Sequence, residues 1–133
     1  MADLLNTFNN QLTNLSKVLT NRFPENKDLQ LAHTSTKALC SCNKKKPIEL
    51  FTLYVYRYRS IIIDKDESLM LDTDFAGDMS KSDNDNNSFN IMVNLKNNWK
   101  SLTDTEKDHI WKYLQVLIKL TDKHIQTTLA NNK

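Results

Sequence analysis

Apolar residues recur at helical spacing through the first half of the chain, and their pattern predicts three helices. The first stripe covers residues 4–23 and stops at Pro24, whose ring cannot continue a helix. A narrower stripe over residues 25–42 predicts the second helix. The third is expected over residues 47–63, with Pro47 in its first turn. Its stripe consists of Ile48, Phe51, Tyr54, Val55, Tyr58, Ile61 and Ile62.

The third segment has one alternative. Residues 53–63 are rich in aromatic and β-branched side chains, which also favour strands. Strict alternation of apolar and polar positions is absent from this segment, and a helix therefore remains the prediction.

The second half of the chain predicts two more helices, separated from the first three by an acidic loop. We expect residues 64–71 to continue a helix and residues 72–87 to form an exposed, flexible loop. A fourth helix is marked by Phe89, Met92, Leu95 and Trp99. Thr103 followed by Glu106 three residues later is a capping-box signature, which predicts the start of a fifth helix that ends near residue 129. The expected fold is all-α, a single-domain bundle of about five helices over residues 1–133.

Composition supports this fold class. The 133-residue chain contains one glycine and two prolines, too few for the tight turns of a sandwich, a barrel or a doubly wound sheet. The same scarcity excludes a glycine-rich phosphate loop and a dinucleotide-binding fingerprint.

The near-neutral net charge of +2 conceals three segments of alternating sign. Residues 1–60 carry nine basic and four acidic side chains, a net charge of +5. Residues 64–88 carry two basic and eight acidic side chains, a net charge of −6, and residues 89–133 return to +3. The acidic loop therefore interrupts a basic protein.

The sequence predicts a cytoplasmic location. The N-terminus lacks the basic start, apolar run and small-residue cleavage site of a secretory signal. Apolar runs such as residues 61–63 are far shorter than the roughly 20 residues that span a bilayer, so no membrane partner is expected. Cys40 and Cys42 are too close together for an ordinary structural disulfide, and we expect two thiols in a reducing compartment.

The acidic loop contains a pattern that resembles a calcium-binding loop. Its oxygen donors are Asp72, Asp74, Asp78 and Asp83. Gly77 stands at the sixth position, as in an EF-hand, but Ala76 replaces an oxygen ligand and the final acid is Asp rather than Glu. An acidic surface loop explains the pattern better, so neither a metal nor another cofactor is predicted.

Enzyme and zinc chemistry are also not predicted. His33, Cys40 and Cys42 would supply only three zinc ligands, without the usual spacing between the cysteines. His33, His109 and His124 fall on polar faces of the expected helices, where surface histidines explain them without a nucleophile or a catalytic carboxylate. We therefore expect a protein that is not an enzyme.

The candidate binding surface consists of basic and aromatic residues, some just before the third helix and some in its second half. Its members are Lys44, Lys45, Lys46, Tyr56, Arg57 and Arg59. Tyr56 lies off the main apolar stripe and is expected to be exposed. This surface could contact a protein, or it could bind nucleic acid by neutralising phosphates.

Two segments resemble an HMG box. One is Lys45-Lys46-Pro47 before an aromatic helix, and the other is the run from Trp99 to Lys107, Trp99-Lys100-Ser101-Leu102-Thr103-Asp104-Thr105-Glu106-Lys107, which resembles the segment before the last helix of that box. That resemblance implies DNA bending through the minor groove. However, residues 43–114 carry 11 basic and 12 acidic side chains, which argues against a DNA-binding unit.

A second resemblance covers about 100 residues. It joins the helix that ends in Phe23-Pro24, the segment from Lys46 to Tyr58, the aspartate-rich loop, and the segment from Trp99 to Leu114. This order resembles small helical proteins of nucleocytoplasmic large DNA viruses of protists and algae, and the lysine- and asparagine-rich composition is typical of an A/T-rich genome. The resemblance implies a viral helical protein without an assigned activity. The functional expectation is a non-enzymatic interaction or structural protein with a host or virion protein as partner, and the alternative is nucleic-acid binding through residues 44–59.

Overall fold

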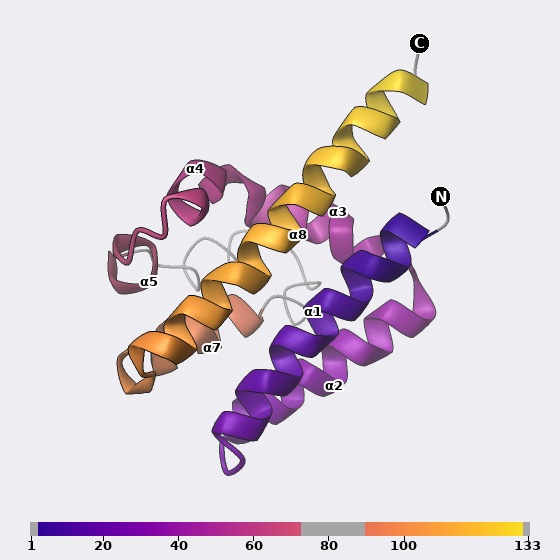
Figure 1. Cartoon of the computed structure of the whole chain (residues 1–133). Helices are drawn as coiled ribbons and strands as arrows, with labels where there is room; N and C mark the ends of the chain where they lie inside the picture. Colours follow the sequence, from indigo (N-terminus) through magenta and orange to yellow (C-terminus); the bar gives the residue numbers. More distant parts are fainter. Residues whose placement is uncertain (1–2, 73–89, 132–133) are drawn as a thin grey trace.

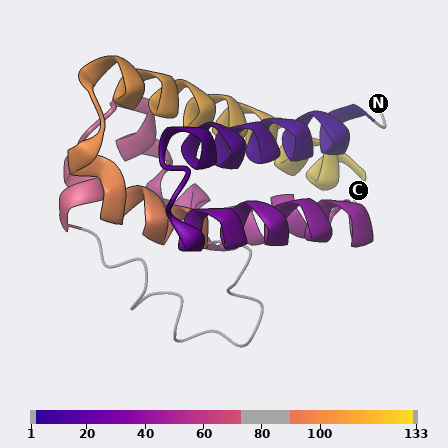
Figure 2. The ribbon, with the colours of Figure 1, turned by 90° about the horizontal axis from the view of Figure 1, so that it is seen from below.

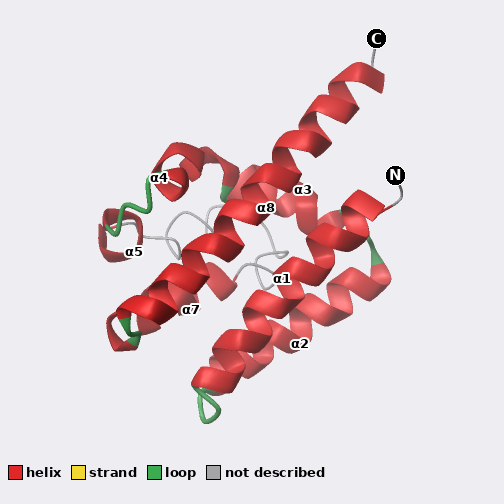
Figure 3. Ribbon diagram, viewed as in Figure 1, coloured by secondary structure: helices red, strands yellow, loops and turns green. Residues whose placement is uncertain are grey.

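The computed structural model describes residues 3–72 and 90–131, and every regular element in these ranges is a helix (Figures 1 and 3). The all-α prediction is confirmed. The α-helices are α1 (Asp3–Arg22), α2 (Lys27–Cys42), α3 (Lys46–Tyr54), α4 (Arg59–Ile63), α5 (Ser68–Asp72), α7 (Asn90–Asn98) and α8 (Asp104–Asn131). Two short 3₁₀ helices, η1 (Tyr56–Tyr58) and η3 (Trp99–Ser101), join α3 to α4 and α7 to α8.

The described residues therefore contain seven α-helices, and the expectation of about five was too low. The main difference lies within residues 47–63, where the expected single helix is divided into α3, η1 and α4. The helix α3 ends at Tyr54, and the next residue, Val55, has a φ of −113°, which departs from helical values. The break falls in a run of aromatic and β-branched residues, which have low helix propensity. The strand alternative for residues 53–63 was wrong.

The helix α1 lies between α2 and α8 and is antiparallel to both (Figures 1 and 2). The N-terminal end of α1 and the C-terminal end of α8 lie at the same end of the molecule, where the last turns of α8 project beyond the other helices. The short helices α4 and α5 lie towards the opposite end, beside α7 and the start of α8. This arrangement leaves one side of α1 exposed along its length.

One apolar core joins the helices. Phe8 of α1 packs edge-on against Phe51 of α3, with ring centroids 5.3 Å apart. Trp99 of η3 packs in the same way against Trp111 of α8, also at 5.3 Å. Both pairs belong to a continuous cluster of buried side chains from α1, α2, α3, α4, α5, α7 and α8. Each fully buried large apolar side chain stabilises the fold by about 1.5–3 kcal/mol relative to an exposed one.

The predicted capping box at the start of α8 is confirmed. The Thr103 backbone N–H donates to Glu106 Oε1 at 2.8 Å, and the Glu106 N–H donates to Thr103 Oγ1 at 3.2 Å. These reciprocal bonds satisfy two N–H groups that a helix start otherwise leaves without partners. None of the helices in the described ranges is long and apolar enough to cross a membrane.

Candidate functional site

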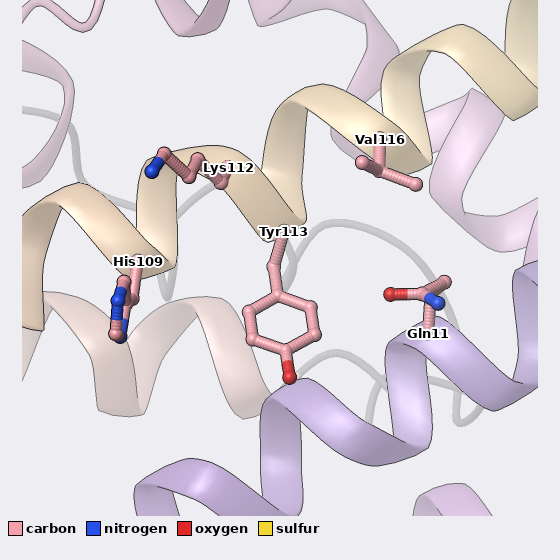
Figure 4. A pocket seen from close by; sticks show the side chains of 5 residues that line it. All are labelled: Gln11, His109, Lys112, Tyr113 and Val116. Carbon is pink, nitrogen blue, oxygen red and sulfur yellow. The ribbon is translucent and has the colours of Figure 1, made fainter.

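A groove runs along the line where α1 and α8 meet, and residues of both helices line it. One part, of about 340 Å³, is lined by Gln11 of α1 and by His109, Lys112, Tyr113 and Val116 of α8 (Figure 4). Tyr113 and Val116 point from α8 towards α1, where Gln11 faces them, and Lys112 lies farther from α1.

A second part of about 330 Å³ continues the groove towards the end of α1. Its lining residues are Val18, Leu19, Asn21, Arg22, Leu102, Glu106, His109 and Ile110. His109 lines both parts, so the two hollows adjoin. Val18 and Val116, one on each helix, keep 37% and 39% of their surface exposed. The groove therefore presents apolar surface that no other helix of the described residues covers.

Ionic contacts fix the end of the groove where α1 meets the start of α8. The Arg22 guanidinium pairs with the Glu106 carboxylate and donates to the Ser101 carbonyl at 3.2 Å. The Thr103 N–H and, to a smaller extent, Arg22 hold the pKa of Glu106 below its usual value. Glu106 thus caps α8 and anchors α1 with the same carboxylate, which holds the two helices together at this end.

The opposite side of α1 meets α2 through polar contacts. Ser16 Oγ lies 2.6 Å from His33 Nδ1, and Asn9 Nδ2 donates to the Lys44 carbonyl at 3.1 Å. Between them, the Thr13 hydroxyl lies 3.9 Å from Cys40 Sγ. The pKa of His33 is lowered, mainly by burial and further by nearby Lys37 and Lys17.

The cysteines have different surroundings. Burial raises the pKa of the Cys40 thiol, which makes its reactive thiolate scarcer at neutral pH. Cys42 is exposed at the end of α2. In residues 3–72 and 90–131, no three His, Cys, Asp or Glu side chains are close enough together to hold a metal ion.

The residues of the predicted basic surface are not brought together. Lys44 and Lys45 lie in the turn before α3 and Lys46 begins it, whereas Arg57 and Arg59 follow its other end. The nine residues of α3 place these two groups about 13 Å apart along the helix. The six predicted binding residues therefore form two separate groups.

Two of those residues contact α8 instead. The Tyr56 hydroxyl donates to Asp122 Oδ1, and Arg59 binds the same carboxylate through Nε at 3.1 Å and Nη2 at 2.9 Å. Arg59 lowers the pKa of Asp122, and the bond to Asp122 raises the pKa of Tyr56. The cluster of Tyr56, Arg59 and Asp122 ties η1 and α4 to α8.

No local sequence signal identifies this cluster, because 66 residues separate Tyr56 from Asp122. The groove was missed for the same reason, since only the fold places Val18 beside α8. The weak calcium-loop pattern cannot be placed in full. Asp72 is the last residue of α5, and Asp74, Asp78 and Asp83 lie outside the described residues.

The comparisons with known proteins give no match to any family model, curated protein or solved structure.

Proposed function

We propose that the protein is a single-domain helical bundle that acts as a non-enzymatic interaction protein, and that the groove between α1 and α8 binds a helix of a partner protein. The observation that carries the proposal is the uncovered apolar surface of Val18 and Val116 between two long helices. The resemblance to helical proteins of large DNA viruses supports a viral origin, with the host cytoplasm or the virion as the place of action.

The shape of the groove suits a helix. Two helices packed side by side leave a furrow into which the side chains of a third helix can insert, at an axis separation of about 8–10 Å. Peptide helices commonly bind such furrows with apolar residues at positions i, i+3 or i+4, and i+7. Val18, Tyr113 and Val116 would contact that apolar stripe, while Gln11 and Asn21 would supply hydrogen bonds at its edge.

The charged residues around the groove indicate which charge the partner helix would carry beside its apolar stripe. Lys112 is 64% exposed, and its ammonium shares Asp108 with Lys65. His109 is exposed at the junction of the two hollows. Among the described residues that line the groove, the only carboxylate belongs to Glu106, which Arg22 already pairs. Acidic residues beside the apolar stripe of the partner would therefore be favoured.

A displayed library of random helical peptides tests this proposal. Peptides selected on the intact protein should carry an apolar stripe with acidic neighbours. Their affinity should fall at least about tenfold for Val116→Glu, because the new carboxylate would have to be buried without a partner. Leu53→Glu is the matched control, since Leu53 is 59% exposed on α3 and lies outside the groove.

The two variants decide the outcome. Loss of binding in Val116→Glu with normal binding in Leu53→Glu supports the groove. Selected peptides that bind both variants as well as they bind the intact protein would show that the groove is not the partner site.

A further inference from the structure

The side of α1 that faces away from the core carries amides and a lysine instead of a mixture of charges. Asn6, Asn10, Asn14, Lys17 and Asn21 are all exposed and follow one another at intervals of three or four residues. This spacing aligns them along a single face of the helix. The face borders the groove at Asn21, which lines its edge, whereas Val18 and Arg22 lie on the side of α1 next to α8.

The neighbouring surface of α2 is basic. Lys17 of α1 and Lys37 of α2 both act electrostatically on His33, whose ring bonds to Ser16 across the line between the helices. Lys44 lies farther along the same line, because its carbonyl accepts a hydrogen bond from Asn9. The three exposed lysines therefore follow the α1–α2 pair from the second half of α1 towards its beginning.

The parts of α1 and α2 that carry these lysines contain no acidic residue. Residues 4–22 and 29–46 contain neither Asp nor Glu. Glu25 and Asp28 are exposed where α1 passes into α2, and Asp64, Asp66, Glu67 and Asp72 are exposed in and around α5, on the other side of α8 in Figure 1. Three of the carboxylates on α8 are paired with Arg22, Lys65 and Arg59. The small net charge of the chain thus hides a one-sided distribution of charge.

We propose that the exposed surface of α1 and α2 binds nucleic acid through its phosphate groups. Lysine ammonium groups neutralise phosphates, and asparagine amides donate hydrogen bonds to phosphate and sugar oxygens. Because α2 flanks α1, the surface cannot insert a single helix deeply into a groove, so the binding does not depend on base sequence. The 20 residues of α1 extend about 30 Å, which matches roughly nine base pairs of a duplex.

An acidic protein fits this surface less well than nucleic acid does. Protein interfaces bury an apolar centre with a polar rim. The exposed large apolar side chains on α1 and α2 are Val18, which lines the groove, and Leu31, which lies two residues from His33 and so on another side of α2. The amide stripe offers hydrogen bonds and charge without apolar area, which suits a hydrated phosphate backbone.

Fluorescence anisotropy with a labelled DNA duplex of 24 base pairs tests the proposal in 50 and 200 mM salt. The intact protein should bind at 50 mM salt and lose affinity steeply at 200 mM. Lys17→Glu with Lys37→Glu should weaken binding at least tenfold at 50 mM and reduce the slope of log affinity against log salt by about 2. The control pair, Lys100→Glu with Lys119→Glu, makes the same change in charge on η3 and α8 and should cost less than about threefold.

A second variant separates the amides from the charges. Asn10→Ala with Asn14→Ala should weaken duplex binding several-fold without changing the salt slope, because amides release no counterions. Absence of binding at 50 mM salt, equal losses in both lysine pairs, or equal displacement by poly-glutamate at matched charge would each overturn the proposal.

The groove and the basic surface give separate results. Val116→Glu should leave duplex binding unchanged, and Lys17→Glu with Lys37→Glu should leave binding of the selected peptides unchanged. Failure of one proposal is therefore visible without failure of the other.

Discussion

At the scale of single residues, the Asp122 carboxylate joins side chains from two other helical segments to α8. It accepts hydrogen bonds from both Tyr56 and Arg59, and its side chain is only 21% exposed. Replacement by asparagine keeps the shape of the side chain but removes the negative charge to which Tyr56 and Arg59 donate their hydrogen bonds. Hydrogen bonds to charged groups contribute more than neutral ones, and we expect Asp122→Asn to lower the free energy of unfolding by about 1–2 kcal/mol at pH 7.

The pH dependence of this loss follows from the lowered pKa of Asp122. A carboxylate with a lower pKa in the folded protein stabilises the fold above its unfolded value of about 3.9, and this contribution disappears as the pH falls through the folded value. The difference between the intact protein and Asp122→Asn should therefore shrink between about pH 5 and pH 2. Urea titrations at several pH values measure it, with Glu25→Gln as an exposed control. A difference that stays constant with pH would contradict the assigned role of the charge.

At the scale of elements, the start of α8 shows how local a capping effect is. Thr103→Ala removes the hydroxyl that accepts the Glu106 N–H, and it should lower the free energy of unfolding by about 1 kcal/mol. Thr105→Ala is the matched control, because Thr105 is exposed inside the first turn of α8 and should change stability by less than about 0.5 kcal/mol. Thermal unfolding followed by circular dichroism compares the two. Equal effects of both substitutions would show that the hydroxyl of Thr103 contributes nothing as a cap.

The same element shows what sequence alone can predict. The capping box was predictable because Thr103 and Glu106 are three residues apart and their geometry depends only on the helix that they begin. The break at Val55 was not, because aromatic and β-branched residues favour several backbone conformations and tertiary contacts decide among them. Tyr56 was expected to be exposed, but Asp122 of α8 becomes its neighbour only after the chain folds. The groove depends likewise on the contact of α1 with α8.

At the scale of the whole molecule, the arrangement of charge limits how partners can approach. The α1–α2 surface is basic except at its turn, where Glu25 and Asp28 are exposed, and a further group of exposed acidic residues at positions 64–72 lies in and around α4 and α5. A charged partner therefore meets a favourable potential on one side and an unfavourable one on the other, which orients the encounter at low salt. The proposed peptide groove lies beside the basic surface, on the α8 side of α1.

The continuous core predicts that all described helices unfold together. Leu114 of α8 is fully buried and contacts the side chains that α1, α3 and α7 contribute to the same cluster. Leu114→Ala should lower the free energy of unfolding by about 2–5 kcal/mol, because it leaves a cavity among these helices. Tryptophan fluorescence from the buried Trp99 and Trp111 and the far-ultraviolet circular dichroism should shift to lower urea by the same amount. Leu129→Ala, at a position 61% exposed near the end of α8, should leave both midpoints nearly unchanged. A dichroism transition that separates from the fluorescence transition would show instead that α1 and α2 form an independent folding unit.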